Sequence, residues 1–181
     1  LYLHYSQIAK EAPLPIILYN VPSRTACDLL PETIGRLAAH ANIIGVKEAT
    51  GDLTRIKSIQ KNVQEFSSGK FDLFSGDDAT AREFMRQGGD GVISVTANIV
   101  PELMLQLCHA SLNHQEDIAD AIQAKLLPLH HALFLEANPI PAKWALSQMG
   151  LISDDIRLPL TVLSFKHQTA LSQAMKTAGC L

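Results

Sequence analysis

The stretch Ile43–Ala49, with the sequence Ile-Ile-Gly-Val-Lys-Glu-Ala, is a short apolar run that contains a single lysine. A run of this length is too short for a typical helix and predicts a buried strand. A charged lysine is costly to bury, and burial favours the neutral amine, which can attack a carbonyl carbon and form a Schiff base. Lys47 is therefore a candidate nucleophile. The alternative is that its stem packs in the strand while its amine extends into water.

Three further runs rich in Ile, Val, Leu or Phe predict strands. They are Pro15–Asn20, Phe71–Ser75 and Gly91–Ala97. Helix-like stretches, marked by proline, capping residues or apolar periodicity, separate the four runs. These stretches cover residues 31–39, 52–66, 78–87 and 101–112. The alternation predicts an α/β fold whose parallel strands are buried on both faces.

No strand is expected after residue 113, where the pattern becomes helical. Helices are predicted over 115–135, 140–149 and 166–178, with a loop around 153–163. We therefore divide the chain into an α/β part, residues 1–113, and a C-terminal helical domain, residues 114–181.

The composition narrows the classes of protein to which the chain could belong. The 181 residues are 47% hydrophobic with a net charge of −3, which suits one soluble domain and argues against nucleic acid. No apolar run approaches the roughly 20 residues needed to cross a membrane. Cys27, Cys108 and Cys180 are widely spaced and odd in number, so we expect reduced thiols in a cytoplasmic protein. The adjacent His130 and His131 would face different ways on a helix, and we expect no metal or other cofactor.

Polar residues gather where the predicted strands end. Tyr19, Lys47 and Gly76 follow or close three successive strands, and active sites of β/α folds form at the carboxyl ends of their strands. Because side chains alternate along a strand, Glu48 should point away from Lys47. Tyr19 could relay protons to the amine, or could pack at the strand end with a solvated hydroxyl. Arg24 lies in the loop after the first strand and could bind a carboxylate, or could be an ordinary surface arginine.

Five motifs resemble the dihydrodipicolinate synthase family and occur in order between Leu1 and Leu181. The motifs are Tyr19–Thr25 (YNVPSRT), Gly45–Gly51 (GVKEATG), Phe74–Asp78 (FSGDD), Gly91–Asn98 (GVISVTAN) and Asn138–Trp144 (NPIPAKW). The resemblance implies the second half of a (β/α)8 TIM barrel, with four βα units, followed by a C-terminal helical domain. We therefore expect residues 1–113 to be a partial barrel.

The same resemblance implies a class I aldolase-type lyase that condenses pyruvate with aspartate semialdehyde, in lysine and diaminopimelate biosynthesis. Lys47 would form the Schiff base with pyruvate, and Tyr19 would relay protons. Arg24 would bind the carboxylate of the semialdehyde, while Gly76 and Ile93 would line the pyruvate site, Ile93 through its main chain. Ala26 departs from the family pattern, which usually has glycine there, and we expect it to stiffen the loop.

The resemblance further implies a homotetramer, with a contact between dimers near Leu53 and Thr54. A complete barrel takes about 250 residues, so we expect this chain to be a fragment that is inactive alone. Two alternatives stay open. One is another pyruvate-dependent lyase, of the N-acetylneuraminate lyase or 2-keto-3-deoxy sugar acid aldolase type, although the pair Ser23-Arg24 favours the synthase. The other is a non-catalytic remnant.

Overall fold

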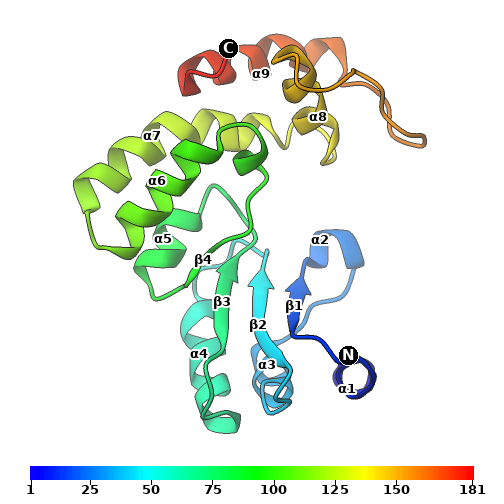
Figure 1. Cartoon of the computed structure of the whole chain (residues 1–181), viewed down its shortest axis with the longest axis vertical. Helices are drawn as coiled ribbons and strands as arrows, with labels where there is room; N and C mark the ends of the chain where they lie inside the picture. The colour runs from blue at the N-terminus through cyan, green and yellow to red at the C-terminus, as the bar shows by residue number, and fades with distance from the viewer. The chain divides into compact units, whose positions relative to one another are not determined.

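The computed structural model describes all 181 residues, which group into two compact units (Figure 1). The first unit is Leu1–Ile93 and the second is Ser94–Leu181. The predicted boundary at residue 113 separates a partial barrel from a helical domain. It is a different division from that between the two compact units, and it stays a prediction.

The first unit is built on a parallel sheet, as predicted. Its strands are β1 (Ile16–Asn20), β2 (Ile43–Glu48), β3 (Asp72–Ser75) and β4 (Gly91–Val92). They lie side by side in the order β1-β2-β3-β4, so each strand pairs with the next one along the chain. The helices are α1 (Tyr2–Glu11), α2 (Pro22–Thr25), α3 (Pro31–Leu37), α4 (Arg55–Phe66) and α5 (Ala81–Arg86).

The fourth strand is much shorter than predicted. The run Gly91–Ala97 has strong β propensity, but β4 covers only its first two residues. The Ile93 amide still donates to the Ser75 carbonyl at 2.9 Å, and pairing then stops. The Ala97 amide donates to Ser94 Oγ at 2.8 Å, and a 3-10 turn, η1 (Thr96–Asn98), follows. This local side-chain bond competes with the ladder and ends the strand.

The segment after β1 also differs from the prediction. We expected Arg24 in a loop, but it lies in the single-turn helix α2, which begins with Pro22 at a first helical position. Ala26 ends this helix in the left-handed conformation, with φ 53°. Because that conformation favours glycine, Ala26 is a strained departure from the family pattern.

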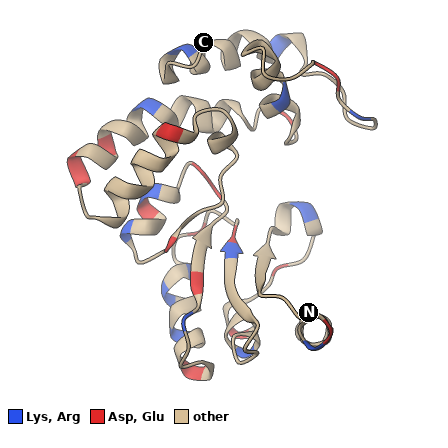
Figure 2. Ribbon diagram, in the orientation of Figure 1, with Lys and Arg blue, Asp and Glu red and all other residues tan.

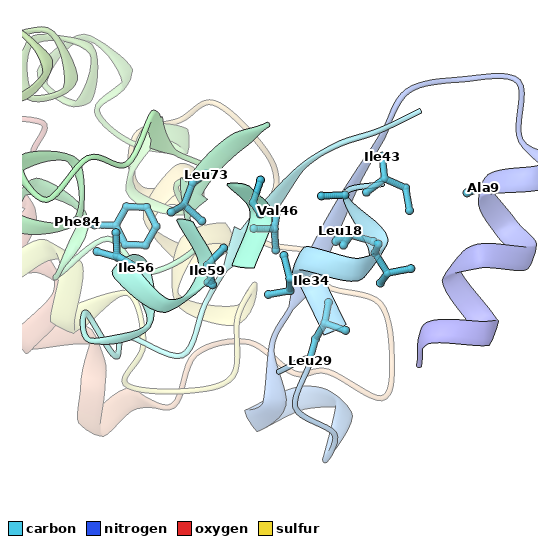
Figure 3. Packing of buried hydrophobic residues seen from close by; sticks show 13 residues of the cluster. Ala9, Leu18, Leu29, Ile34, Ile43, Val46, Ile56, Ile59, Leu73 and Phe84 are labelled. Atoms are coloured by element: carbon cyan, nitrogen blue, oxygen red, sulfur yellow. The ribbon is translucent and has the colours of Figure 1, made fainter. Parts of the chain in front are cut away.

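The core of the first unit lies on one face of the sheet. Leu18, Val46 and Leu73 point from three neighbouring strands toward the helices, as Figure 3 shows. There they meet Ile34 of α3 and Ile59 of α4, and all five side chains are at most 3% exposed. Burial of each such side chain stabilises the fold by about 1.5–3 kcal/mol.

The opposite face is open, so the prediction that the strands are buried on both faces is wrong. Ile17 and Tyr19 of β1 are 43% and 46% exposed, and Ile93 is 41% exposed. Helices α3, α4 and α5 each contribute buried side chains to the core on the other face, among them Ile34, Ile56 and Phe84. Figure 2 shows that β1 carries no charge and that the charges of β2 lie at its carboxyl end.

The second unit is helical, as predicted. Its elements after η1 are α6 (Pro101–Leu112), α7 (Glu116–Ala132), α8 (Ile140–Gln148) and α9 (Phe165–Ala178). Helix α7 packs against both α6 and α9, and Leu107, Leu129 and Leu171 of these three helices are fully buried. Throughout the chain, every helix is too short or too polar to cross a membrane.

Candidate active site

Lys47 and Tyr19 are neighbours on the open face of the sheet. They are register partners in the parallel pair β1–β2, one residue before each strand ends. The Lys47 Nζ atom lies 4.2 Å from the centroid of the Tyr19 ring. The amine therefore meets the face of the ring rather than the hydroxyl, in the geometry of a cation–π contact. Lys47 is half-buried, so its amine is held against the ring and can still be reached from the open face.

Gly76 leaves room beside the lysine stem. Its amide donates to the Glu48 carbonyl at 2.7 Å, which holds the backbone after β3 close to the end of β2. A Cβ atom at this position would lie 3.0 Å from Lys47 Cε and 2.5 Å from Ala49 Cβ. The approach to Ala49 is closer than real Cβ contacts allow, and the approach to Lys47 would push the lysine stem aside, so glycine lets the chain pass Lys47 this closely.

Phe74 joins the site, although its motif, Phe74–Asp78, gave it no predicted role. It is the register partner of Lys47 on the side away from Tyr19, and it is half-buried. Parallel pairing puts register partners on the same face of a sheet. An aromatic residue thus stands on each side of Lys47. Only the register, which no sequence motif reveals, identifies the second of them.

Ile93 and Arg24 lie farther along the same end of the sheet. Ile93 follows β4 directly and is exposed, with its amide committed to Ser75. Arg24 is exposed on α2, and its guanidinium makes no hydrogen bond or ion pair within the chain. The structure brings Tyr19, Lys47 and Gly76 together, whereas Arg24 stands above the strand ends without a side-chain partner.

Glu48 points away from Lys47, as predicted, and enters a buried polar network. It is 2% exposed and accepts a hydrogen bond from Arg55 Nε at 3.2 Å. Asn20 Nδ2 lies 3.2 Å and 3.1 Å from its two carboxylate oxygens, and the Thr50 amide donates to it at 2.9 Å. Sequence reasoning missed this network, because its members lie far apart in the chain.

The histidines weighed as metal ligands face different ways. His130 is buried, with its Nδ1 atom 2.7 Å from Thr96 Oγ1 within the second unit. His131, the next residue of α7, is exposed. The pair therefore does not present two ring nitrogens to one point.

The family resemblance seen in the motifs is matched by comparisons with known proteins. The Dihydrodipicolinate synthetase family matches residues 1–178. The 4-hydroxy-tetrahydrodipicolinate synthase of Ectopseudomonas mendocina is 55% identical over 181 residues, which is 100% of this chain and 61% of that relative. The corresponding synthase of Legionella pneumophila strain Corby is 52% identical over 97% of this chain and 59% of its own length.

A solved structure shows the same fold. The dihydrodipicolinate synthase of Acinetobacter baumannii, complexed with pyruvate, superposes with a TM-score of 0.93 at 48% identity. The match covers 99% of this chain and 60% of that one, so the chain spans about three fifths of the relatives' length. The predicted fold is thereby confirmed as the C-terminal portion of a (β/α)8 barrel followed by helices. On these grounds the chain belongs to the dihydrodipicolinate synthetase family.

Proposed function

We propose that the protein acts as a pyruvate-dependent synthase, which condenses pyruvate with aspartate semialdehyde in the biosynthesis of diaminopimelate and lysine. The observation that carries the proposal is the amine of Lys47, held 4.2 Å from the centre of the Tyr19 ring at the open carboxyl end of the sheet. The Acinetobacter baumannii relative, solved with pyruvate, supports the choice of keto acid.

Lys47 is the proposed nucleophile. Its neutral amine attacks the keto carbon of pyruvate to give a carbinolamine, which loses water to form a protonated imine. The imine withdraws electrons, so the methyl carbon loses a proton and becomes an enamine. The enamine carbon then bonds to the aldehyde carbon of aspartate semialdehyde, whose oxygen takes up a proton. Attack by the semialdehyde's own amine on the imine carbon would close the ring and release Lys47.

Tyr19 is the proposed proton relay. Each of these steps moves a proton, and a phenol beside the amine can accept and return one. Because Lys47 Nζ meets the face of the ring, we expect the hydroxyl to reach the reacting atoms through substrate or water rather than by a direct bond to the amine.

Three further residues would bind substrate. Arg24 has an unpaired guanidinium whose fork suits the carboxylate of the semialdehyde. Gly76 would let pyruvate approach Lys47 closely, and Ile93 would contact it through its main chain. Each of these three roles is implied by the family resemblance, and the position of each residue is compatible with it.

Assembly and location complete the proposal. We propose a homotetramer with a contact near Leu53, which is partly buried, and Thr54, which is exposed. Light scattering on Leu53→Asp, which should dissociate the tetramer, tests this contact. We also place the protein in the cytoplasm, where its three free cysteines would stay reduced.

Borohydride trapping with pyruvate tests the proposed function. Two samples are needed: the chain itself, and a chimera that joins it to the portion of the Ectopseudomonas mendocina relative that it does not match. We expect a reduced adduct on Lys47, mapped by peptide mass spectrometry. Lys47→Ala should abolish it. Lys57→Ala, which removes an exposed lysine of α4, should not.

The two samples separate three outcomes. An adduct in the chain alone would show that these 181 residues suffice to activate Lys47. An adduct only in the chimera, followed by condensation with aspartate semialdehyde, would support the synthase and the inactivity of the isolated chain. If neither sample traps pyruvate, the Schiff-base mechanism is wrong. Trapping without condensation would favour another pyruvate lyase.

A further inference from the structure

Arg55 connects two segments that flank the candidate site. It lies at the start of α4 and is 14% exposed. Its Nη1 and Nη2 atoms donate to the two carboxylate oxygens of Asp28 at 3.0 Å and 3.1 Å, in a bidentate fork. Its Nη2 also donates to the Leu29 carbonyl at 2.9 Å, and its Nε donates to Glu48 at 3.2 Å. One side chain thus holds the α2–α3 connection and the end of β2 together.

Asn20 completes the connection from the end of β1. Its Nδ2 atom donates to Asp28 Oδ1 at 2.9 Å and lies within hydrogen-bond distance of Glu48. Its Oδ1 atom accepts the Leu29 amide at 2.9 Å. Asn20 and Glu48 are register partners and are both 2% exposed. They directly follow Tyr19 and Lys47, so the network lies behind the reactive pair, on the covered face.

We propose that Arg55 is a positioning residue with two separate arms. The Glu48 arm fixes the end of β2 and therefore the place of Lys47 opposite Tyr19. The Asp28 arm fixes the connection that begins with α2 and therefore the place of Arg24. Arg55 touches no substrate in this proposal, and the inference rests on the proposed function because it assigns a kinetic consequence to each arm.

The energetics favour geometry over stability as the role of this network. A buried ion pair contributes little net stability compared with apolar residues of the same size, because both charges lose their water. The hydrogen bonds of such a pair are directional, however, and an arginine fork donates to a carboxylate in one plane only. A displacement of about 1 Å at a reacting group can lower a rate about 100-fold. A network that holds two strand ends and a connection is well suited to prevent such a displacement.

Two variants test the arms separately, in whichever form of the protein traps pyruvate. Asp28→Asn changes an exposed residue and weakens the first arm, together with the hydrogen bond that Asp28 accepts from Asn20, but leaves the bond between Arg55 and Glu48 in place. We expect KM for aspartate semialdehyde to rise about tenfold, the effect of losing one charge-assisted hydrogen bond. KM for pyruvate and the trapping rate at Lys47 should change less than about twofold. Glu48→Gln keeps the shape of the buried side chain and weakens the second arm, so here the trapping rate should fall about tenfold.

Arg55→Lys and a control complete the design. The lysine keeps the charge but cannot reproduce the fork, so it should show both defects together. Lys57→Met, an exposed change on the same helix, should show neither. The thermal midpoint is measured for every variant.

The outcomes distinguish this inference from the proposed function. If the apparent kcat and trapping rate of Asp28→Asn and Glu48→Gln fall only in proportion to the folded fraction, with KM unchanged, the network is merely structural and the inference is overturned. Unchanged kinetics in both variants would overturn it as well. Failure of the unsubstituted protein to trap pyruvate would refute the proposed function, and the two-arm inference would fall with it.

Discussion

The two faces of the sheet in the first unit differ in what they hold. On the covered face, Leu18, Val46 and Leu73 are at most 3% exposed and pack against helices. On the open face, Ile17 and Tyr19 are 43% and 46% exposed, although they alternate with Leu18 along the same strand. Adjacent residues of one strand therefore differ in burial: one packs in the core of this unit, and the next lies on the face that would point into a complete barrel.

The comparison shows how a lysine can lie in an apolar strand without destabilising the fold. Lys47 follows Val46, which is fully buried, and precedes Glu48, which is almost so. The charge of Glu48 is compensated behind the sheet by Arg55, and that of Lys47 is presented in front of it. Substitutions at neighbouring residues of one strand should therefore affect either the stability of the fold or the candidate site. This makes the difference between the two faces testable.

Leu18→Ala and Ile17→Ala should give the largest difference. Removing the buried Leu18 side chain leaves a cavity, and we expect the free energy of unfolding to fall by about 2–5 kcal/mol. Ile17→Ala removes an exposed side chain and should change it by about 0.5 kcal/mol or less. Urea denaturation of both variants measures the two values. Equal losses would mean that something covers the open face in solution, and the comparison would need revision.

Gly76→Ala should affect the open face selectively. The added methyl group would lie 3.0 Å from Lys47 Cε and 2.5 Å from Ala49 Cβ, so the strand end and the amine must shift. We expect the rate of pyruvate trapping to fall about 100-fold. Gly69→Ala is the matched control, because its nearest neighbour, Ser67 Oγ, is 3.8 Å away. Trapping at the original rate in Gly76→Ala would show that Lys47 does not need this space.

The helices and the first three strands could largely be predicted from the sequence. Helix α6 occupies the predicted residues 101–112, because Pro101 marks its start and apolar spacing marks its length. Strand parity correctly put Glu48 opposite Lys47. The strand pattern alone does not show the open face, because parallel strands rich in Ile and Val look the same whether one or both faces are covered. The open face follows instead from the predicted half barrel, since its side chains would point into the interior of a complete barrel.

The remaining differences between prediction and structure have two local causes and one long-range cause. The run 91–97 looked like a strand, but a bond from the Ala97 amide to Ser94 Oγ redirects it into η1. Arg55 meets Asp28 across 27 residues, and no spacing rule in one sequence predicts such a pair. Pro22, a residue typical of a first helical position, is the sequence signal for α2.

Glu83 offers a smaller effect, away from the open face. Hydrogen bonds from Arg86 and then Gln87 lower the pKa of its carboxyl from 4.5 to about 2. The ionised form therefore stabilises the fold above pH 4.5, and this stabilisation is lost as the pH falls toward 2. Because the side chain is 31% exposed, we expect the loss to be about 1 kcal/mol. Denaturation at several pH values should show a steeper decline in the parent than in Glu83→Gln.

The same variant also checks the separation of roles. Glu83 lies on α5 and contacts neither Lys47 nor Tyr19. The rate of trapping in Glu83→Gln should therefore equal that of the parent at neutral pH. A changed rate would mean that the charge of Glu83 on α5 influences Lys47, and the covered and open faces would then not be independent.

Ala26→Gly should have the smallest effect, and it tests the segment that carries Arg24. Ala26 has φ 53°, a conformation that destabilises a residue with a Cβ by about 1–2 kcal/mol. Glycine relieves this strain but adds about 0.4–1 kcal/mol of chain entropy to the unfolded state. We expect a net gain of about 0.5 kcal/mol in urea denaturation. If Ala26 instead stiffens the segment to hold Arg24, KM for aspartate semialdehyde should rise in the glycine variant while pyruvate trapping stays unchanged. An unchanged KM would mean that Ala26 does not hold Arg24 in place, and would leave this role to the Asp28 arm of Arg55.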